Sequence, residues 1–105
     1  MSESEFLEAA EATLAAVEHA VDTADTDIEV SRAGNVLTLE LGDGSKLIIN
    51  SQGPMQQMWI AGKGGAFHYA RSGDHWLDTR DGSEFFESLS RLISAQGGQA
   101  IVVGR

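Results

Sequence analysis

Apolar residues recur with helical spacing along the first quarter of the chain. At about 100° per residue, the apolar side chains between residues 4 and 24 fall on one face of a helix, and polar side chains occupy the remaining arc. Ser2 and Glu5 have the spacing of a capping box, and Ser4 is an alternative N-cap. The pattern predicts an amphipathic helix over residues 4–24 whose buried face consists of Phe6, Ala10, Leu14, Val17 and Val21.

The middle of the chain alternates apolar and polar residues with a period of two, which is typical of strands that bury one face. Leu37, Leu39 and Leu41 form one such apolar series. Gly42-Asp43-Gly44 follows them and supplies the positive φ angles that a tight hairpin needs. Turn residues separate six expected strands, at Ile28–Ser31, Val36–Leu41, Ser45–Asn50, Met55–Ala61, Phe67–Arg71 and His75–Asp78.

A second helical pattern occupies the end of the chain. Asp81 and Glu84 have capping-box spacing, so we expect a helix to begin near Asp81, and Gly97-Gly98 provides a helix stop. The apolar tail Gln99–Val103 is expected to lie against the core or between the helices. The apolar face of this second helix consists of Phe85, Phe86, Leu89, Leu92 and Ile93.

A helix, about six strands and a second helix predict an α+β fold. We expect a two-layer sandwich in which both helices pack on one face of a mainly antiparallel sheet, while the other face stays open to water. The sequence contains no repeat and no low-complexity linker, so residues 1–105 are expected to form a single domain. Trp76 follows a Gly-Asp turn and is expected at the edge of this fold.

Charge is distributed unevenly along the sequence. Residues 1–29 contain nine acidic residues and neither Lys nor Arg, whereas seven acidic and seven basic residues balance each other in the remainder. The formal net charge of −9 therefore belongs to the first segment. Such a field repels nucleic-acid phosphates and anionic lipid, and it attracts cations or a basic protein. The self-repulsion also favours a monomer.

The sequence lacks the usual signals for membranes and export. No apolar run is long enough to span a bilayer, so no membrane association is expected. No basic residue precedes Arg32, which argues against a secretory signal or an Arg-rich transit peptide and favours the cytoplasm. The chain contains no cysteine, which excludes disulfides and thiolate metal ligands.

The acidic residues of the first helix form a stripe on a different face from its apolar residues. Like charges one turn apart, such as Glu18 and Asp22, weaken a helix, so stability does not explain this arrangement. Carboxylates suit hard cations such as iron, manganese or calcium, and a convex surface predicts weak, water-rich coordination. The alternatives are a merely solvated acidic face and, for His19, an ordinary solvated histidine. The candidate metal ligands are Glu11, Glu18, His19, Asp22, Asp25, Asp27 and Glu29.

The strand around Trp59 places large polar and aromatic groups on the open face of the predicted sheet. Gln57, Trp59 and Ala61 point to one side of this strand, whereas Met58 and Ile60 point to the core. Tryptophan is favoured at binding hot spots because it combines a large apolar area with one hydrogen-bond donor. The alternative is that Trp59 only covers the sheet.

One motif links these features to a known family. The pattern Asn50-x-Gln52-x-Pro54-x-x-Gln57-x-Trp59-x-Ala61, followed by Gly64-Gly65, His68-Tyr69 and Gly73-Asp74-x-Trp76, is similar to the signature of the frataxin family and of its bacterial, CyaY-type branch. The resemblance extends along the whole chain, from the acidic first helix to the closing helix. Ala66 departs from the pattern, because bacterial members often have glycine there, and it affects a turn rather than the strand face.

The resemblance implies an iron-binding accessory protein of iron–sulfur cluster assembly. By family analogy, the chain binds the cysteine desulfurase, modulates sulfur delivery to the scaffold and supplies iron from its acidic stripe. A second and more specific contact with this machinery is expected at Asn50, Gln52, Gln57, Trp59 and His68.

Two other functions are compatible with the residues. A ferroxidase that oxidises and stores iron needs an inward cage of carboxylates and histidine, and the sequence contains no Glu-x-x-His motif. There is also no nucleophile elbow, so we expect no enzymatic activity. The second alternative is an acidic protein-interaction module that needs no metal.

Overall fold

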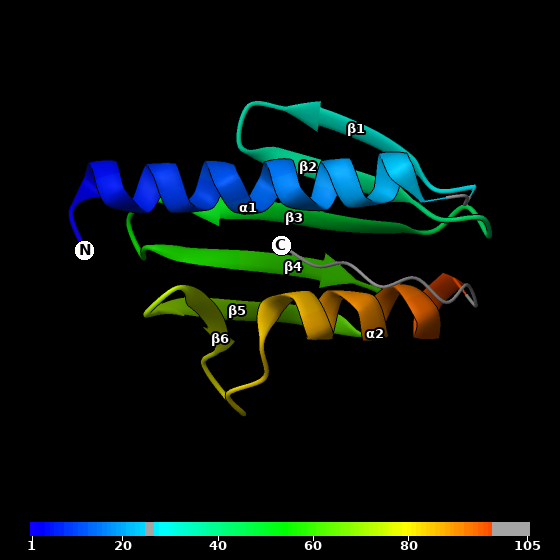
Figure 1. Ribbon diagram of the computed structural model, residues 1–105. Coiled ribbons are helices and arrows are strands. Elements are labelled where there is room, and N and C mark those ends of the chain that lie inside the picture. The colour runs from blue at the N-terminus through cyan, green and yellow to red at the C-terminus, as the bar shows by residue number, and fades with distance from the viewer. Residues whose placement is uncertain (25–26, 98–105) are drawn as a thin grey trace.

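The computed structural model describes residues 1–24 and 27–97, which form two helices and six strands (Figure 1). The predicted strands are all present, and their ends differ from the expected ones by at most two residues. Asp25 and the tail Gln99–Val103 lie outside the described ranges. In chain order the elements are α1 (Glu3–Thr23), β1 (Glu29–Ala33), β2 (Val36–Glu40), β3 (Lys46–Gln52), β4 (Gln57–Gly62), β5 (Gly65–Ser72), β6 (His75–Asp78) and α2 (Phe85–Gly97).

All six strands form one sheet in the order β1-β2-β3-β4-β5-β6, and each strand runs antiparallel to its neighbours. Both helices lie across the same face of this sheet, which leaves the opposite face without a helix from the described residues (Figure 1). The predicted α+β two-layer sandwich is therefore confirmed. Neither of these helices is long and apolar enough to cross a membrane.

The core lies between the helices and the inner face of the sheet. The five predicted apolar residues of α1 all point inward and are buried. Alternate residues of the central strands are also inaccessible, as the period-two pattern predicted. These buried strand residues are Leu37, Leu39, Leu47, Ile49, Met58 and Ile60.

The second helix begins later than predicted. Glu84 pairs with Leu77 of β6 in an isolated bridge, which keeps the chain extended up to this residue. Its carboxylate then accepts hydrogen bonds from the backbone N–H groups of Phe86 (2.9 Å) and Glu87 (3.2 Å), so Glu84 itself caps the helix. Asp81 lies in the preceding turn. The predicted start near Asp81 is therefore wrong.

Trp76 lies on the edge strand β6, but its side chain is buried with only 1% of its surface exposed. The indole packs edge-to-face against Phe6 of α1, with ring centroids 5.9 Å apart. Its Nε1 atom donates a hydrogen bond to the hydroxyl of Thr13 (2.8 Å). Trp76 therefore packs against the edge of the fold, as expected, and attaches α1 to this edge of the sheet.

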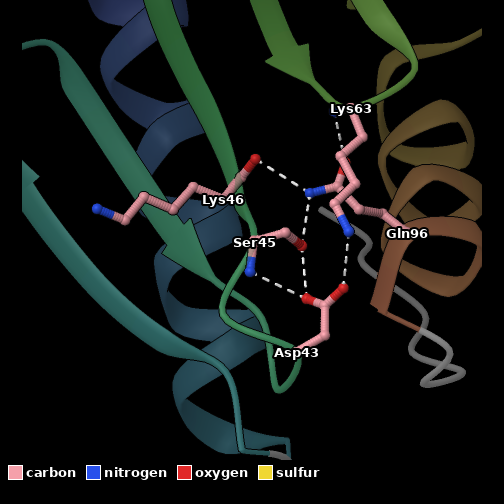
Figure 2. Close-up of polar contacts among 5 residues, drawn as sticks. All are labelled: Asp43, Ser45, Lys46, Lys63 and Gln96. Atoms are coloured by element: carbon pink, nitrogen blue, oxygen red, sulfur yellow. Dashed lines mark hydrogen bonds and ion pairs between the residues drawn. The ribbon is translucent and has the colours of Figure 1, made fainter.

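Polar contacts connect two hairpin turns to the end of α2 (Figure 2). The Gln96 side chain accepts a hydrogen bond from the backbone N–H of Lys63 (2.9 Å) and donates to the Ser45 hydroxyl (2.9 Å) and the Lys46 carbonyl (3.1 Å). The Lys63 ammonium lies 3.0 Å from the Asp43 carboxylate. We call this network the turn clamp, because it fixes the β2–β3 and β4–β5 turns relative to α2.

Candidate functional site

The predicted metal ligands lie along an exposed side of α1 and continue to β1, which runs beside α1 (Figure 1). Glu18 is partly covered, and the other carboxylates are exposed, as is the neighbouring His19. Asp25 lies outside the described residues, so the structure does not place it. We call this surface the acidic face; its described members are Glu8, Glu11, Glu18, Asp22 and Asp27. Glu29 is paired with Glu40 next to the buried Leu39, so its side chain extends from the open face of the sheet, away from α1.

Arg32 of β1 lies against the acidic face. Its Nη2 atom is 2.6 Å from Glu11 Oε1, and its Nη1 atom is 3.6 Å from Glu18 Oε1. The two glutamates are about two helical turns apart and extend from the same side of α1, so one guanidinium reaches both. The hydrogen bond from Arg32 lowers the pKa of Glu11 below its ordinary value. This contact was not predicted, because Arg32 belongs to the part of the sequence in which acidic and basic residues balance each other.

Asp27 rests against the β2–β3 turn. A Cβ atom on Gly42 would collide with the Asp27 carboxylate, so the glycine permits this close approach. The same turn is held by the turn clamp through Asp43 and Lys63 (Figure 2). Asp27 therefore lies against a turn that also contacts the end of α2 through Gln96.

The acidic face suits a hard cation in its chemistry, but it does not form a cage. Carboxylate oxygens and imidazole nitrogen are suitable ligands for iron. Within residues 1–24 and 27–97, however, no three acidic or histidine side chains converge closely enough to hold a metal ion. A cation on this surface would therefore contact one or two carboxylates and keep most of its water.

The second predicted surface lies on the open face of the sheet. The strand register places Trp59 of β4 between Asn50 of β3 and His68 of β5, so that the three residues form one row across the sheet. Gln52 and Gln57 are paired in the adjacent row. All five predicted partner-binding residues therefore lie together, and each is partly exposed. We call these five residues the sheet patch.

Contacts within the sheet patch hold the Trp59 side chain in place. Its ring stacks on His68, with centroids 4.2 Å apart and planes inclined by 13°. Its Nε1 atom donates to Gln57 Oε1 (2.9 Å), and Gln52 donates to Asn50 Oδ1 (3.1 Å). Because the single indole donor is already used, a partner would contact Trp59 mainly through its apolar surface.

Comparisons with known proteins agree with this architecture. The family model of the Frataxin-like domain matches residues 1–99. A protein of Janthinobacterium sp. (strain Marseille), named iron-sulfur cluster assembly protein CyaY, is 52% identical over 108 residues, which cover 98% of this chain and 96% of the relative. A protein of the same name from Ralstonia pickettii (strain 12J) is 56% identical over 101 residues, which cover 91% and 89%.

A solved structure has the same fold. The frataxin from Psychromonas ingrahamii, which belongs to the CyaY protein family, superposes on this chain with a TM-score of 0.93 at 32% sequence identity, and the match covers 100% of both chains. The sequence motif around Trp59 predicted this relationship, and the extent of both matches confirms it. This chain belongs to the frataxin family, in its bacterial CyaY-type branch.

Proposed function

We propose that this chain is an accessory protein of iron–sulfur cluster assembly, which presents iron at its acidic face and docks on the cysteine desulfurase. Relatives about half identical over nearly their whole length are named iron-sulfur cluster assembly proteins, which supports a role of this class. The roles of iron and of the desulfurase are inferred from the residues of the two surfaces.

The main support for this proposal is that acidic residues occupy positions at which they destabilise α1. Asp22 lies in the last turn of the helix, which contains no basic residue, and there it opposes the helix macrodipole. Glu18, one turn earlier, adds like-charge repulsion. Stability alone would favour lysine at these positions. We therefore attribute the acids to the attraction of cations and of a basic protein surface.

Iron on this surface is cargo and not a fixed cofactor. Because a cation would contact only one or two carboxylates, it would bind weakly, and weak binding suits delivery to another protein. A ferroxidase is less well supported, since the described acidic and histidine side chains form no group that could hold a metal.

The sheet patch provides a contact of a different kind. Trp59 is already ordered by His68 and Gln57, so it loses little conformational freedom when a partner covers it. The acidic face provides salt-dependent attraction, whereas an aromatic anchor provides specific affinity. We assign both contacts to the desulfurase, which would then cover parts of both layers of the fold, α1 and the open sheet face (Figure 1).

The docking proposal is tested by the affinity for purified cysteine desulfurase at low and high salt. Glu18→Lys/Asp22→Lys is expected to weaken binding by about tenfold or more at low salt, and the loss should shrink as salt screens the charges. Glu3→Lys/Glu87→Lys is the matched control, because it changes the net charge equally at exposed positions at the start of α1 and on α2. Equal losses in both double variants would refute docking through the acidic face.

Trp59→Ala tests the sheet patch in the same assay. We expect affinity to fall by about tenfold or more, because truncation removes the aromatic anchor. The thermal unfolding temperature should change little, since Trp59 lies outside the core. Unchanged affinity, or loss of the fold, would contradict this role of Trp59.

Anaerobic titration with Fe²⁺, followed by NMR, separates the iron-binding role from a metal-independent interaction module. Saturable changes confined to the acidic face, around Glu18 and Asp22, would support iron binding. Weak changes spread evenly over all carboxylates would favour the module, and oxygen consumption by catalytic amounts of protein would favour a ferroxidase.

A further inference from the structure

Two side-chain amides of the sheet patch are oriented by hydrogen bonds within the patch. The indole Nε1 of Trp59 can only donate, so the Gln57 atom that it contacts at 2.9 Å is necessarily the carbonyl oxygen Oε1. The amino group of Gln57, Nε2, is therefore turned away from this bond. Asn50 likewise accepts a hydrogen bond from Gln52 at its Oδ1 atom (3.1 Å), and its own amino group, Nδ2, takes no part in that contact.

The internal bonds therefore use the carbonyl oxygens of the two amides beside Trp59 and leave their amino groups. Within residues 1–24 and 27–97, no protein group accepts a hydrogen bond from Gln57 Nε2 or Asn50 Nδ2. Both side chains are partly exposed on the open face of the sheet. A partner that covers this face is best matched if it supplies hydrogen-bond acceptors, because buried donors without an acceptor lower affinity.

The charges of the chain narrow the chemistry of these acceptors. The five residues of the sheet patch include no carboxylate, ammonium or guanidinium group. The whole chain carries a formal net charge of −9, which opposes the approach of an acidic segment. Neutral amide donors match neutral acceptors, and side chains bond mostly to main-chain groups and water. Unused main-chain carbonyls occur in loops, since those of helices and strands are already bonded.

Stacking restricts the side from which a partner meets Trp59. In the row across the sheet, His68 lies on the β5 side of Trp59 and Asn50 lies on the β3 side. The imidazole covers one face of the indole, with ring planes inclined by 13°. The other face is therefore on the Asn50 side, so an apolar group that rests on it comes close to the Asn50 amino group.

We propose that the sheet patch binds an uncharged loop of the desulfurase through main-chain carbonyl groups, which accept hydrogen bonds from Gln57 and Asn50 while an apolar side chain of the loop covers Trp59. This inference rests on the proposed function, because it assumes that the sheet patch is a docking surface. It adds the chemistry of the contacted segment and assigns specificity to the two amides. The alternative is that both amides only hold the patch together and keep the sheet soluble.

Two nearly isosteric substitutions test the proposal, with purified desulfurase as the probe. Gln57→Glu keeps an oxygen for the Trp59 N–H, and Asn50→Asp keeps an oxygen for Gln52, but each replaces the unused donor by an acceptor. We expect each variant to bind the desulfurase about tenfold or more weakly than the native chain, because two acceptors then face each other. If the amides serve only the patch itself, affinity should change by about twofold or less.

Gln56→Glu is the matched control for the added negative charge. Gln56 is the neighbour of Gln57 and is also partly exposed, but its side chain donates to the Met1 carbonyl and takes no part in the sheet patch. We expect a loss of about twofold or less, which salt should reduce. The larger losses in Gln57→Glu and Asn50→Asp should persist at high salt, because they come from short-range contacts.

The NMR signal of the Trp59 Nε1–H group separates recognition from a loss of structure. In Gln57→Glu the indole donates to a carboxylate, so the signal should move to higher chemical shift and stay sharp. The urea concentration at the midpoint of unfolding should stay close to the native value. If the signal shows a displaced indole, Asn50→Asp decides the question, because it leaves the bond between Trp59 and Gln57 in place.

The outcomes distinguish this inference from the proposed function. Native affinity in Gln57→Glu and Asn50→Asp, or losses equal to that of Gln56→Glu, would overturn the role of the amides, while a loss in Trp59→Ala would still support docking through the sheet patch. Losses that disappear at high salt would overturn the assignment of neutral carbonyl acceptors, since they would indicate a charged partner group. Native affinity in Trp59→Ala would contradict docking through the patch and this inference with it.

Discussion

At the scale of single residues, the Thr13 hydroxyl performs two tasks at once. It is buried, donates a hydrogen bond to the Ala9 carbonyl (2.8 Å) and accepts one from Trp76 Nε1 (2.8 Å). Thr13→Val keeps nearly the same shape but leaves the buried indole N–H without an acceptor. We expect it to lower the free energy of unfolding by about 1–3 kcal/mol, measured by urea denaturation.

Thr23→Val is the matched control for this prediction. The Thr23 hydroxyl also donates to a helix carbonyl, that of His19 (2.9 Å), but it is exposed and receives no buried donor. Its substitution should change the free energy of unfolding by no more than about 0.5 kcal/mol. Equal effects at Thr13 and Thr23 would show that the bond to Trp76 contributes nothing.

Residue-level contacts of this kind were the part of the structure that the sequence did not reveal. The helical pattern placed Thr13 on α1, and the turn before Trp76 placed that residue at a sheet edge. Nothing in either local pattern indicates that residues 63 positions apart share a hydrogen bond. Arg32 was missed for the same reason, because its pairing with Glu11 requires the position of β1 beside α1.

At the scale of elements, the turn clamp makes stability depend on pH. The Asp43 carboxylate accepts hydrogen bonds from the Ser45 hydroxyl (2.6 Å) and backbone N–H (3.0 Å), and it pairs with Lys63 (3.0 Å). These contacts, the Ser45 hydroxyl first, hold the pKa of Asp43 well below its ordinary value. A carboxylate with a lowered pKa stabilises the fold fully above its unfolded-state pKa of about 4, and this stabilisation is lost as the pH falls below that value.

Asp43→Asn tests this dependence, because it removes the charge and keeps the shape. At pH 7 we expect the native chain to unfold at a higher urea concentration than the variant, and the difference should shrink at pH 3 at constant ionic strength. A difference that stays constant or grows between pH 7 and pH 3 would contradict the assignment.

The start of α1 agrees with its local capping signal, whereas the start of α2 differs from its capping signal because a tertiary contact intervenes. Ser2 and Glu5 form the predicted capping box, with bonds of 3.0 and 3.1 Å, and α1 begins there. Asp81 and Glu84 have the same spacing, but the bridge between Glu84 and Leu77 keeps the chain extended. The second helix therefore begins one residue after Glu84, with Glu84 as its cap.

At the scale of the whole molecule, the sheet register assembles a binding surface from residues that the sequence could only assign to strands. Period two placed Gln57 and Trp59 on the open face. The row that joins Trp59 to Asn50 and His68 depends on the lengths of the two hairpins that connect β3, β4 and β5. These three residues were predicted to act together because of the family motif, since periodicity alone does not give the register. The acidic face was predictable as a charge distribution, whereas the ion pairs of Arg32 with Glu11 and Glu18 were not.

The distribution of charge over the molecule leads to a last prediction, in which stability and binding change in opposite directions. Asp22 opposes the helix macrodipole and repels Glu18, and it lies in the segment that holds the whole net charge of −9. Asp22→Lys should therefore raise the free energy of unfolding by about 0.5–1 kcal/mol, which corresponds to roughly 3–6 °C in the unfolding temperature for a domain of this size.

Glu3→Lys makes the same change of charge at the other end of α1, where an acidic residue favours the helix dipole, so it should give no such gain. Equal gains from both substitutions would assign the effect to net charge alone, and a loss in Asp22→Lys would contradict the argument. If Asp22→Lys is more stable and also binds the desulfurase less tightly, the acid at this position serves binding at the expense of stability. This outcome would connect the acidic last turn of α1 to the proposed function of the chain.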